Sequence, residues 1–539
     1  MKPEGVGQAS WEAALSAFEQ AIGSERVFTS DEDIALYRDA YSPMWGEADE
    51  RLISAAVAPT STEEVQAIVR TANQFGIPIY PISTGKNLGY GGSAPNLSGS
   101  VVVDLKDMRS IIEVDDERHF AIVEPGVSYF DLFDYIQERD LKCWIDCPDP
   151  GWGSLVGNAL EHGVGHTWYT YRDHFASHCG MEVVLPNGDI VRTGMGALPG
   201  SKTWSDFRYG FGPDMDGIFG QGNFGIVTKM GFHLMPQPDA FISKKVRVPR
   251  RRDIIPLVKI TNEFEYGGIL GMPIYESPLT QLQAAGDEEL GALMDSPEVW
   301  HNDSLDLLAA SRELPFWECT LQFYGPREGI YANFDFVKDR ILAEIPDAEF
   351  VDLEELQFPL SQEEQASVRH KVAVGIPNLN IFSVSARSRT NPNPGDGHLL
   401  FSPVIPRTGT DLLEAQQIFG EALRGSPLAS LYTPFTPPFT WLHRCFALAC
   451  GFPISRSDPS INAASRDAME TVIRIGAENG YGEYRTPPLF QDLVSSTYSY
   501  NNHALRRLTE TVKDAVDPNG IIAAGRNGIW PKHLRERRQ

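Results

Sequence analysis

Hydrophobic and polar positions change their period several times in the first third of the chain. After residue 61, apolar side chains recur at helical spacing, which predicts one buried helical face. The positions on this face are Val65, Ile68, Val69 and Ala72. Short apolar runs rich in Val and Ile then predict buried strands. These runs occupy residues 77–83, 100–105 and 120–127.

Polar residues and glycines mark where these elements begin and end. Ser61 followed by Glu64 has the capping-box pattern of a helix start, and Gly76 predicts the end of that helix. Ser128 and Asp131 predict a cap for a second helix.

Residues 181–194 contain two β-rich runs separated by Asn187-Gly188, which predicts a hairpin. βαβ units mixed with antiparallel hairpins favour an α+β fold over a doubly wound sheet.

A change of composition divides the chain into three segments. Residues 243–480 are richer in Pro and long loops than residues 1–242, which predicts a second domain there. Residues 481–539 contain a helix ended by the sequence DPNG, and we expect this last segment to return to the first domain.

Charge and composition exclude several classes of function. The 539 residues carry a formal net charge of −26, which disfavours binding to nucleic acid or to an anionic membrane surface. The N-terminus reads as an amphipathic helix without a secretory h-region, and no run of about 18 apolar residues predicts a membrane span. Six cysteines without a CxxC pair are typical of reduced thiols, so we expect a cytoplasmic protein.

The loop from Pro81 to Gly92 is the most informative candidate for chemistry. It follows a predicted strand, and four of its residues are glycines that can bring backbone N–H groups close to a phosphate. The loop matches neither the Walker A pattern nor GxGxxG, which argues against both a P-loop NTPase and a Rossmann dinucleotide site. An ordinary tight turn explains the glycines equally well.

Three further groups of residues are weaker candidates. The histidines could hold a zinc ion, although the neighbouring glycines disfavour a helix there and favour ordinary hydrogen-bonded histidines. These histidines are His162, His166, His174 and His178. Tyr484-Arg485 offers a phenolic donor and a guanidinium to an oxyanion, and Asp149 lies between two prolines as a positioned carboxylate or a turn residue.

Seven ordered blocks resemble the vanillyl-alcohol oxidase / p-cresol methylhydroxylase family of flavoproteins. The blocks are PISTGKNLGYGG, EPGVSYFDL, DCPDPGWGS, GMEVVLPNGDIVRTGMGALPG, FGQGNFGIVTKMGFHLMP, EYRT and DPNGIIAAGRNGI. The resemblance implies an FAD-binding domain of two α+β subdomains, made from residues 1–242 and 481–539. It also implies that residues 243–480 form a cap with a large antiparallel sheet over the substrate.

The resemblance also implies which residues bind FAD. The residues similar to the pyrophosphate loop are Thr84, Gly85, Lys86, Asn87, Gly89, Gly91 and Gly92. Those in blocks similar to other parts of the FAD site are Glu182, Gly222, Asn223, Gly225, Ile226 and Val227. Arg526 resembles a cation near the flavin pyrimidine ring. His398 opens a GHxxFSPV block and no Tyr lies between 381 and 398, so the resemblance implies 8α-linkage of FAD to His398.

The implied substrates are para-substituted phenols, such as 4-alkylphenols, 4-hydroxybenzylic alcohols and lignin-derived phenols. Tyr90, Tyr484 and Arg485 resemble the groups that bind the phenol as phenolate. A hydride would leave the para benzylic carbon for flavin N5 and give a p-quinone methide. Asp149 resembles the carboxylate near N5, which favours the oxidase branch that reduces O2 to H2O2.

Several alternatives stay open. Either Tyr169 or Tyr171 can take the place of an active-site tyrosine, and we prefer Tyr171; His443 resembles another cap histidine near the substrate. A relative that passes electrons to a cytochrome c, or an oxidase of another alcohol, is the nearest alternative function. A zinc hydrolase and a non-catalytic nucleotide-binding module are more distant ones. The expected assembly is a homodimer or a dimer-based oligomer.

Overall fold

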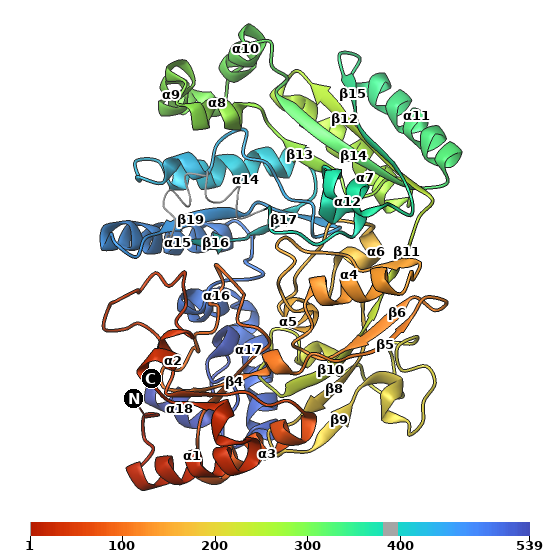
Figure 1. The fold of residues 1–539 in the computed structure, drawn as a ribbon. Coiled ribbons are helices and arrows are strands. Elements are labelled where there is room, and N and C mark those ends of the chain that lie inside the picture. The colour runs from red at the N-terminus through yellow and green to blue at the C-terminus, as the bar shows by residue number, and fades with distance from the viewer. Residues whose placement is uncertain (1, 381–396, 539) are drawn as a thin grey trace.

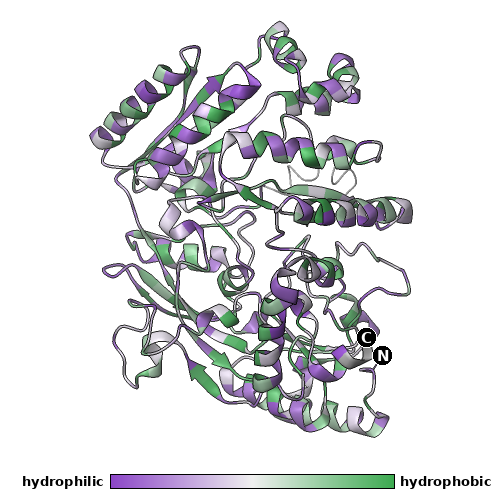
Figure 2. Cartoon of the chain, turned by 180° about the vertical axis from the view of Figure 1, so that it is seen from behind, coloured by the Kyte–Doolittle hydropathy of each residue, from purple (hydrophilic) through white to green (hydrophobic). Residues whose placement is uncertain are grey.

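The computed structural model describes residues 2–380 and 397–538. The predicted His398 linkage depends partly on the lack of a tyrosine just before His398. Residues 381–396, which make up nearly all of that stretch, lie outside the described residues. The first and last segments of the chain form the lower part of Figure 1, and the middle segment forms the upper part. The two chain ends lie beside each other in both views (Figures 1 and 2).

The lower part contains two sheets. The first has the strand order β1-β2-β4-β3, and β2, β4 and β3 run parallel. Its strands are β1 (Val27–Phe28), β2 (Ala55–Val57), β3 (Ile79–Ile82) and β4 (Val101–Asp104). Helix α1 (Gln8–Ile22) and helix α3 (Thr62–Phe75) connect with this sheet through one hydrophobic cluster. The predicted helix after Ser61 is therefore confirmed, with Gly76 as a left-handed C-cap at φ 64°.

Only half of the predicted capping box forms at that helix. The Ser61 hydroxyl accepts from the Glu64 N–H at 3.2 Å. The Glu64 carboxylate accepts instead from the Arg26 guanidinium, at 2.6 Å, and from the Thr60 N–H, at 2.7 Å, so the Ser61 N–H does not receive it. The cap predicted at helix α4 (Tyr129–Glu138) is confirmed, and Ser128 and Asp131 form both bonds of a capping box there.

The second sheet is antiparallel, with the order β5-β6-β10-β8-β9. Its strands are β5 (Ile111–Asp115), β6 (Phe120–Val123), β8 (His178–Val184), β9 (Ile190–Arg192) and β10 (Ile226–His233). β8 and β9 form the predicted hairpin, and Gly188 at φ 84° supplies the left-handed residue of its turn. The predicted strands at 77–83 and 120–127 are real but shorter, since prolines and glycines end them early.

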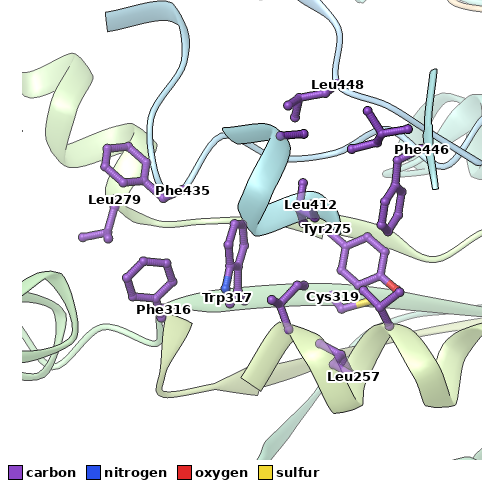
Figure 3. Packing of buried hydrophobic residues seen from close by; sticks show 14 of the residues in the cluster. Leu257, Tyr275, Leu279, Phe316, Trp317, Cys319, Leu412, Phe435, Phe446 and Leu448 are labelled. Carbon is purple, nitrogen blue, oxygen red and sulfur yellow. The ribbon is translucent and has the colours of Figure 1, made fainter. Parts of the chain in front are cut away.

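The upper part contains the expected antiparallel sheet, with the order β13-β14-β12-β15. Its strands are β12 (Ala240–Val248), β13 (Ile274–Glu276), β14 (Trp317–Gly325) and β15 (Glu349–Gln357). Its main helices are α7 (Ile254–Tyr266), α11 (Arg327–Glu344), α14 (Gly409–Ala422) and α15 (Pro459–Glu478). Figure 3 shows the core between sheet and helices, where Trp317 and Tyr275 lie among apolar side chains.

Two short strand pairs continue the upper part toward the lower one. β16 (Gly397–Phe401) pairs with β19 (Cys450–Ile454), and β17 (Val404–Pro406) pairs with β18 (Cys445–Ala447). An isolated antiparallel β-bridge between Pro403 and Glu483 joins the stretch between β16 and β17 to the last segment.

The last segment returns to the first sheet after helix α17 (Tyr500–Val516). The Ile79 N–H donates to the Ile521 carbonyl, and the Ala523 N–H donates back to Ile79, each at 2.7 Å. These contacts join segments more than 440 residues apart. The α+β class is confirmed, whereas the exact domain boundaries at 242/243 and 480/481 stay predictions.

The distribution of hydropathy follows the packing. Figure 2 shows green, hydrophobic residues on the strands of the lower part, while the peripheral helices carry both kinds of residue. All six cysteines are free thiols. Among the described residues, no helix is both long and apolar enough to cross a membrane.

Candidate active site

A deep cleft in the lower part holds most of the residues predicted to bind a cofactor. It lies between the end of β3 with the loop that follows, helix α5 (Leu155–Leu160), residues 219–227 and the last segment. Its empty space, counted out to the open mouth, is about 1110 Å³. The predicted residues in its wall are Thr84, Gly85, Lys86, Asn87, Gly92, Gly222, Gly225, Ile226, Val227 and Arg526.

Glycines bring backbone close to this cleft where a side chain has no room. Gly85 has φ 65°, and a Cβ built on it would lie 2.1 Å from Ser93 Oγ. A Cβ on Gly222 would lie 1.9 Å from the Ile218 carbonyl oxygen. A wall of this kind lets an extended ligand contact the main chain directly.

Basic side chains complete the fit to a cofactor that carries a pyrophosphate. Lys86, Arg485 and Arg526 all lie in the wall of the cleft. Arg526 is buried, donates to the Tyr80 hydroxyl at 2.7 Å and pairs with Glu161. Close backbone beside Lys86 and Arg485, with the Arg526 charge balanced by Glu161, suits an anionic dinucleotide, so these residues fit FAD.

Five of the predicted cofactor residues do not line the cleft. Glu182 is buried on β8, where Lys229 and Arg192 pair with its carboxylate. Asn223 donates to the carbonyls of Ala523 and Ile529, both at 3.0 Å. These two side chains hold the walls of the cleft together, and their direct contact with FAD stays a prediction.

The other three residues are Gly89, Gly91 and His398, which pack around the glycine loop outside the wall of the cleft. A Cβ on Gly91 would meet the Pro488 ring at 2.4 Å, and one on Gly89 would lie 3.3 Å from the His398 ring. His398 begins strand β16 and is thus brought directly against the loop. Burial lowers the pKa of His398 to about 4, so its imidazole is neutral at neutral pH.

The residues predicted to bind the phenol come together beside the loop. The Arg485 guanidinium lies 4.0 Å from the centre of the Tyr90 ring and donates to Asn87 Oδ1 at 2.6 Å. The Tyr90 hydroxyl hydrogen-bonds with Ser402 Oγ at 2.8 Å. Tyr484 precedes Arg485 in the chain and is half-buried. Three distant segments therefore meet in one cluster.

Burial sets the protonation of this cluster. It raises the pKa of Tyr90 and Tyr484, although the Arg485 charge opposes the shift, so both phenols stay protonated and can donate. Burial also raises the pKa of Glu483 well above its usual range. The Glu483 carboxyl accepts from the Ser402 N–H at 2.8 Å and so links the two halves of the cluster.

The remaining predicted catalytic residues, Asp149 and Tyr171, belong to the first segment and lie where it contacts the middle segment. Asp149 follows β7 (Cys143–Trp144), in a loop held by the Gly151 N–H, which donates to the Asn378 carbonyl at 2.9 Å. Tyr169 stacks on His443 with 4.6 Å between ring centres. Tyr171 packs instead against a small hydrophobic cluster. The contact with His443 thus belongs to Tyr169, and a catalytic role for Tyr171 stays a prediction.

A buried charge cluster joins these elements across the two parts of the molecule. Glu265 on α7 pairs with Arg172, which ends helix α6 (Tyr169–Arg172), at 2.5 Å, and with Arg407. His443 Nδ1 lies 3.6 Å from the same carboxylate. Burial favours a higher pKa for Glu265, but the nearby His443 ring and the two arginine charges lower it to about 2.

Two of the four histidines of the candidate zinc cluster bind separate carboxylates. His174 hydrogen-bonds with Asp146 and His178 with Asp216, each at 2.8 Å. Within residues 2–380 and 397–538, no group of three or more His, Cys, Asp or Glu side chains could hold a metal ion.

Sequence reasoning did not identify Ser402, Glu483 or Glu265 as parts of the site. Ser402 lies within the GHLLFSPV block, yet nothing local indicates a contact with a tyrosine 312 positions away. For Glu483 the only available signal was its place beside Tyr484-Arg485.

Comparisons with known proteins agree with this geometry. Residues 53–194 match a family model described as an FAD binding domain. The chain is 32% identical over 536 residues to the 4-cresol dehydrogenase (hydroxylating) flavoprotein subunit of Pseudomonas putida, which covers 98% of this chain and 97% of that protein.

Two solved structures are similar over nearly the whole chain. The 4-ethylphenol oxidase of Gulosibacter chungangensis, in complex with isoeugenol, has a TM-score of 0.83 at 34% identity and covers 99% of this chain and 100% of that one. A p-cresol methylhydroxylase with substrate bound has a TM-score of 0.82 at 30% identity, over 98% and 99% of the two chains. The chain therefore belongs to the vanillyl-alcohol oxidase / p-cresol methylhydroxylase family and is an FAD-dependent oxidoreductase.

Proposed function

We propose that the protein oxidises para-substituted phenols at the benzylic carbon, with O2 as electron acceptor. The meeting of Tyr90, Tyr484 and Arg485 beside the FAD cleft is the observation that carries this proposal. The relatives described above, named for a cresol or an ethylphenol, support the same substrate class.

The cluster has the chemistry needed to bind a phenolate. Tyr90 and Tyr484 stay protonated and donate, and Arg485 supplies a cation, so together they lower the pKa of a bound phenol. Electron release from the phenolate oxygen weakens the para benzylic C–H bond. FAD, when bound, supplies the acceptor for the hydride. Asp149 would act as the base toward the water that adds to the resulting p-quinone methide.

Replacement of Arg485 by Ala tests the proposal. We expect kcat/KM for a 4-alkylphenol to fall by about 10²–10³, because a preorganised charge on the oxyanion is lost. Flavin absorbance should remain, since the cleft keeps its other cations. Arg507→Ala, at an exposed arginine of α17, is the matched control. Unchanged turnover in R485A would refute the phenolate site.

We also propose that FAD is covalently attached through His398. This rests on a neutral imidazole placed against Gly89 of the loop. Flavin fluorescence should stay with the wild-type protein on a denaturing gel, and His398→Ala should release its flavin in acid. His301→Ala, at an exposed histidine, should retain the attachment. Flavin that acid extracts from the wild-type protein would eliminate the linkage.

The electron acceptor distinguishes the proposal from its nearest alternative. One relative is named an oxidase and another a dehydrogenase, which leaves a cytochrome acceptor as the second candidate. Peroxide formed in air in equal amount to oxidised phenol supports O2, whereas turnover that requires an artificial acceptor supports the alternative. The cytoplasmic location and the dimer-based assembly remain part of the proposal; light scattering of the purified protein tests the assembly.

A further inference from the structure

A single carboxylate lies in the wall of the FAD cleft, among three cations. It belongs to Glu161, which directly follows helix α5. Among the described residues that form this wall, Glu161 is the one Asp or Glu. A negative charge does not help a cleft to bind an anionic dinucleotide, because like charges repel. The carboxylate therefore has a purpose other than attraction of FAD.

The first partner of Glu161 is Arg526. Glu161 Oε1 pairs with the Arg526 guanidinium, which also donates to the Tyr80 hydroxyl at 2.7 Å. Burial favours a lower pKa for Arg526, but the Glu161 charge and the Tyr80 hydroxyl raise it above its ordinary value. The Arg526 side chain is 10% exposed and the Glu161 side chain is 22% exposed, so the carboxylate is the more open of the two charges to the cleft.

The second partner of Glu161 is Asn87, at the end of the glycine loop nearer the phenol-binding cluster. Asn87 Nδ2 lies 3.5 Å from Glu161 Oε2, and Asn87 Oδ1 accepts from Arg485 at 2.6 Å. This orientation of the amide matches both charges, because its oxygen faces the cation and its NH2 group faces the anion. Glu161 is thus two contacts away from the cation of the phenol-binding cluster.

This chain of contacts places Glu161 where it can act on the flavin ring. In the proposed function a hydride passes from the phenol to FAD, so the ring must lie beside Tyr90, Tyr484 and Arg485. Glu161 lines the same cleft and reaches Arg485 through Asn87. A negative charge near the ring opposes its reduction, whereas a cation favours it.

We propose that Glu161 lowers the reduction potential of the bound flavin by offsetting the charge of Arg526. The position of the ring in this statement rests on the proposed function. Arg526 alone would favour the reduced cofactor strongly. With Glu161 beside it, the reduced cofactor is a stronger electron donor, which favours the transfer of its electrons to the acceptor.

Replacement of Glu161 by Gln removes the charge at nearly constant shape. At an effective dielectric constant of about 20, a unit charge roughly 10 Å from the ring changes the equilibrium constant for reduction by about tenfold. We therefore expect the potential of E161Q to rise by about 30 mV for two electrons. The measurement is reduction of the purified holoenzyme by dithionite in equilibrium with a reference dye, which requires no phenol.

Glu138→Gln is the matched control, at an exposed carboxylate of α4. It changes the net charge by the same amount and should leave the potential at the wild-type value. An unchanged or lower potential in E161Q would overturn the proposal. An equal rise in E138Q would overturn it as well, because net charge alone would then explain the shift.

Two further variants test the role of the charge. Glu161→Asp keeps the carboxylate and should change the equilibrium constant less than twofold, whereas a tenfold change in E161D would show that shape, not charge, is the cause. Asn87→Asp adds a carboxylate at the same end of the cleft and should lower the potential. This variant keeps the test valid if E161Q does not retain FAD, and a wild-type potential in N87D would contradict the placement beside the ring.

Failure of the proposed function is distinguishable from failure of this one. Wild-type turnover of a 4-alkylphenol in R485A would refute the phenolate site, yet the dye measurement on E161Q would still report the effect of Glu161. Loss of turnover in R485A together with a wild-type potential in E161Q would overturn only the role of Glu161.

Discussion

The glycine loop of the FAD cleft and the phenol-binding cluster lie side by side but are built in different ways. The loop occupies consecutive residues 81–92, and its shape depends on glycines with positive φ. In the cluster, Tyr90 hydrogen-bonds with Ser402 and Arg485 donates to Asn87, across sequence separations of 312 and 398 residues. One region is a local backbone conformation, whereas the other exists only after folding brings three segments together.

The difference predicts which property each region controls. A change in the loop alters the backbone that faces FAD, so it should affect cofactor binding. A change in the long-range contacts leaves that backbone in place, so it should affect stability or substrate turnover. Substitutions in the two regions can therefore be compared by three measurements: flavin content, unfolding free energy and kcat/KM.

The largest effect is expected for Gly85→Val. Valine is strained at φ 65°, and its Cβ would lie 2.1 Å from Ser93 Oγ, so the loop must change shape. We expect loss of bound FAD and hence of all activity, seen as a fall in flavin absorbance relative to protein absorbance. Gly7→Val is the control, at an extended φ of −68° with nothing within 4 Å. Full flavin content in G85V would show that the glycine loop does not control FAD binding in the way that separates it from the cluster.

Glu265→Ala should have the next largest effect, on stability. It leaves Arg172 and Arg407 buried without their shared carboxylate, which should lower the unfolding free energy by about 3–5 kcal/mol. Denaturant unfolding measures the change, and Glu263→Ala, at an exposed carboxylate two positions before Glu265 on the same helix, is the control.

The same carboxylate gives a pH dependence. The folded pKa of Glu265 is about 2, below its ordinary value of 4.5, so its stabilisation is present above pH 4.5 and is lost as pH falls toward 2. The difference in stability between wild type and E265A should shrink across this interval. A difference that stays constant from pH 5 to 2 would show that the Glu265 charge is not the cause.

Ser402→Ala should have the smallest effect. It removes the hydroxyl partner of Tyr90 but keeps the N–H that donates to Glu483. A single neutral hydrogen bond contributes about 1 kcal/mol, so the unfolding free energy should fall by about that amount and kcat/KM about fivefold, with flavin content unchanged. Ser402→Thr keeps the hydroxyl and should stay close to wild type. Loss of FAD in S402A would mean that the cluster also supports the loop.

Local signals predicted much of the fold because the residues that decide these elements are close in sequence. The helix start at Ser61, the capping box at Ser128 and the hairpin turn at Gly188 all occur where expected. Glu64 departed from its expected bond because Arg26, 38 residues away, offered a stronger partner. A local sequence pattern does not show that a distant side chain will compete for the same carboxylate.

The site was only partly predictable, for the same reason. Ten of the residues predicted from the FAD blocks do line one cleft. Glu182 belongs to matching sequence yet faces Lys229 and Arg192, since alternate positions of a strand point to opposite faces. Tyr169 and Tyr171 are two residues apart, and only the packing of the middle segment decides which of them meets His443.

By itself the sequence determined the elements, the α+β class, the family resemblance and the glycine loop, because each depends on residues within a few positions of one another. Only the tertiary structure decided that Ser402 meets Tyr90, that Glu265 joins Arg172 to Arg407, and that Arg485 meets Asn87. Burial then set the charge of these groups. Burial and long-range contact depend on the whole packed chain, which no local pattern describes.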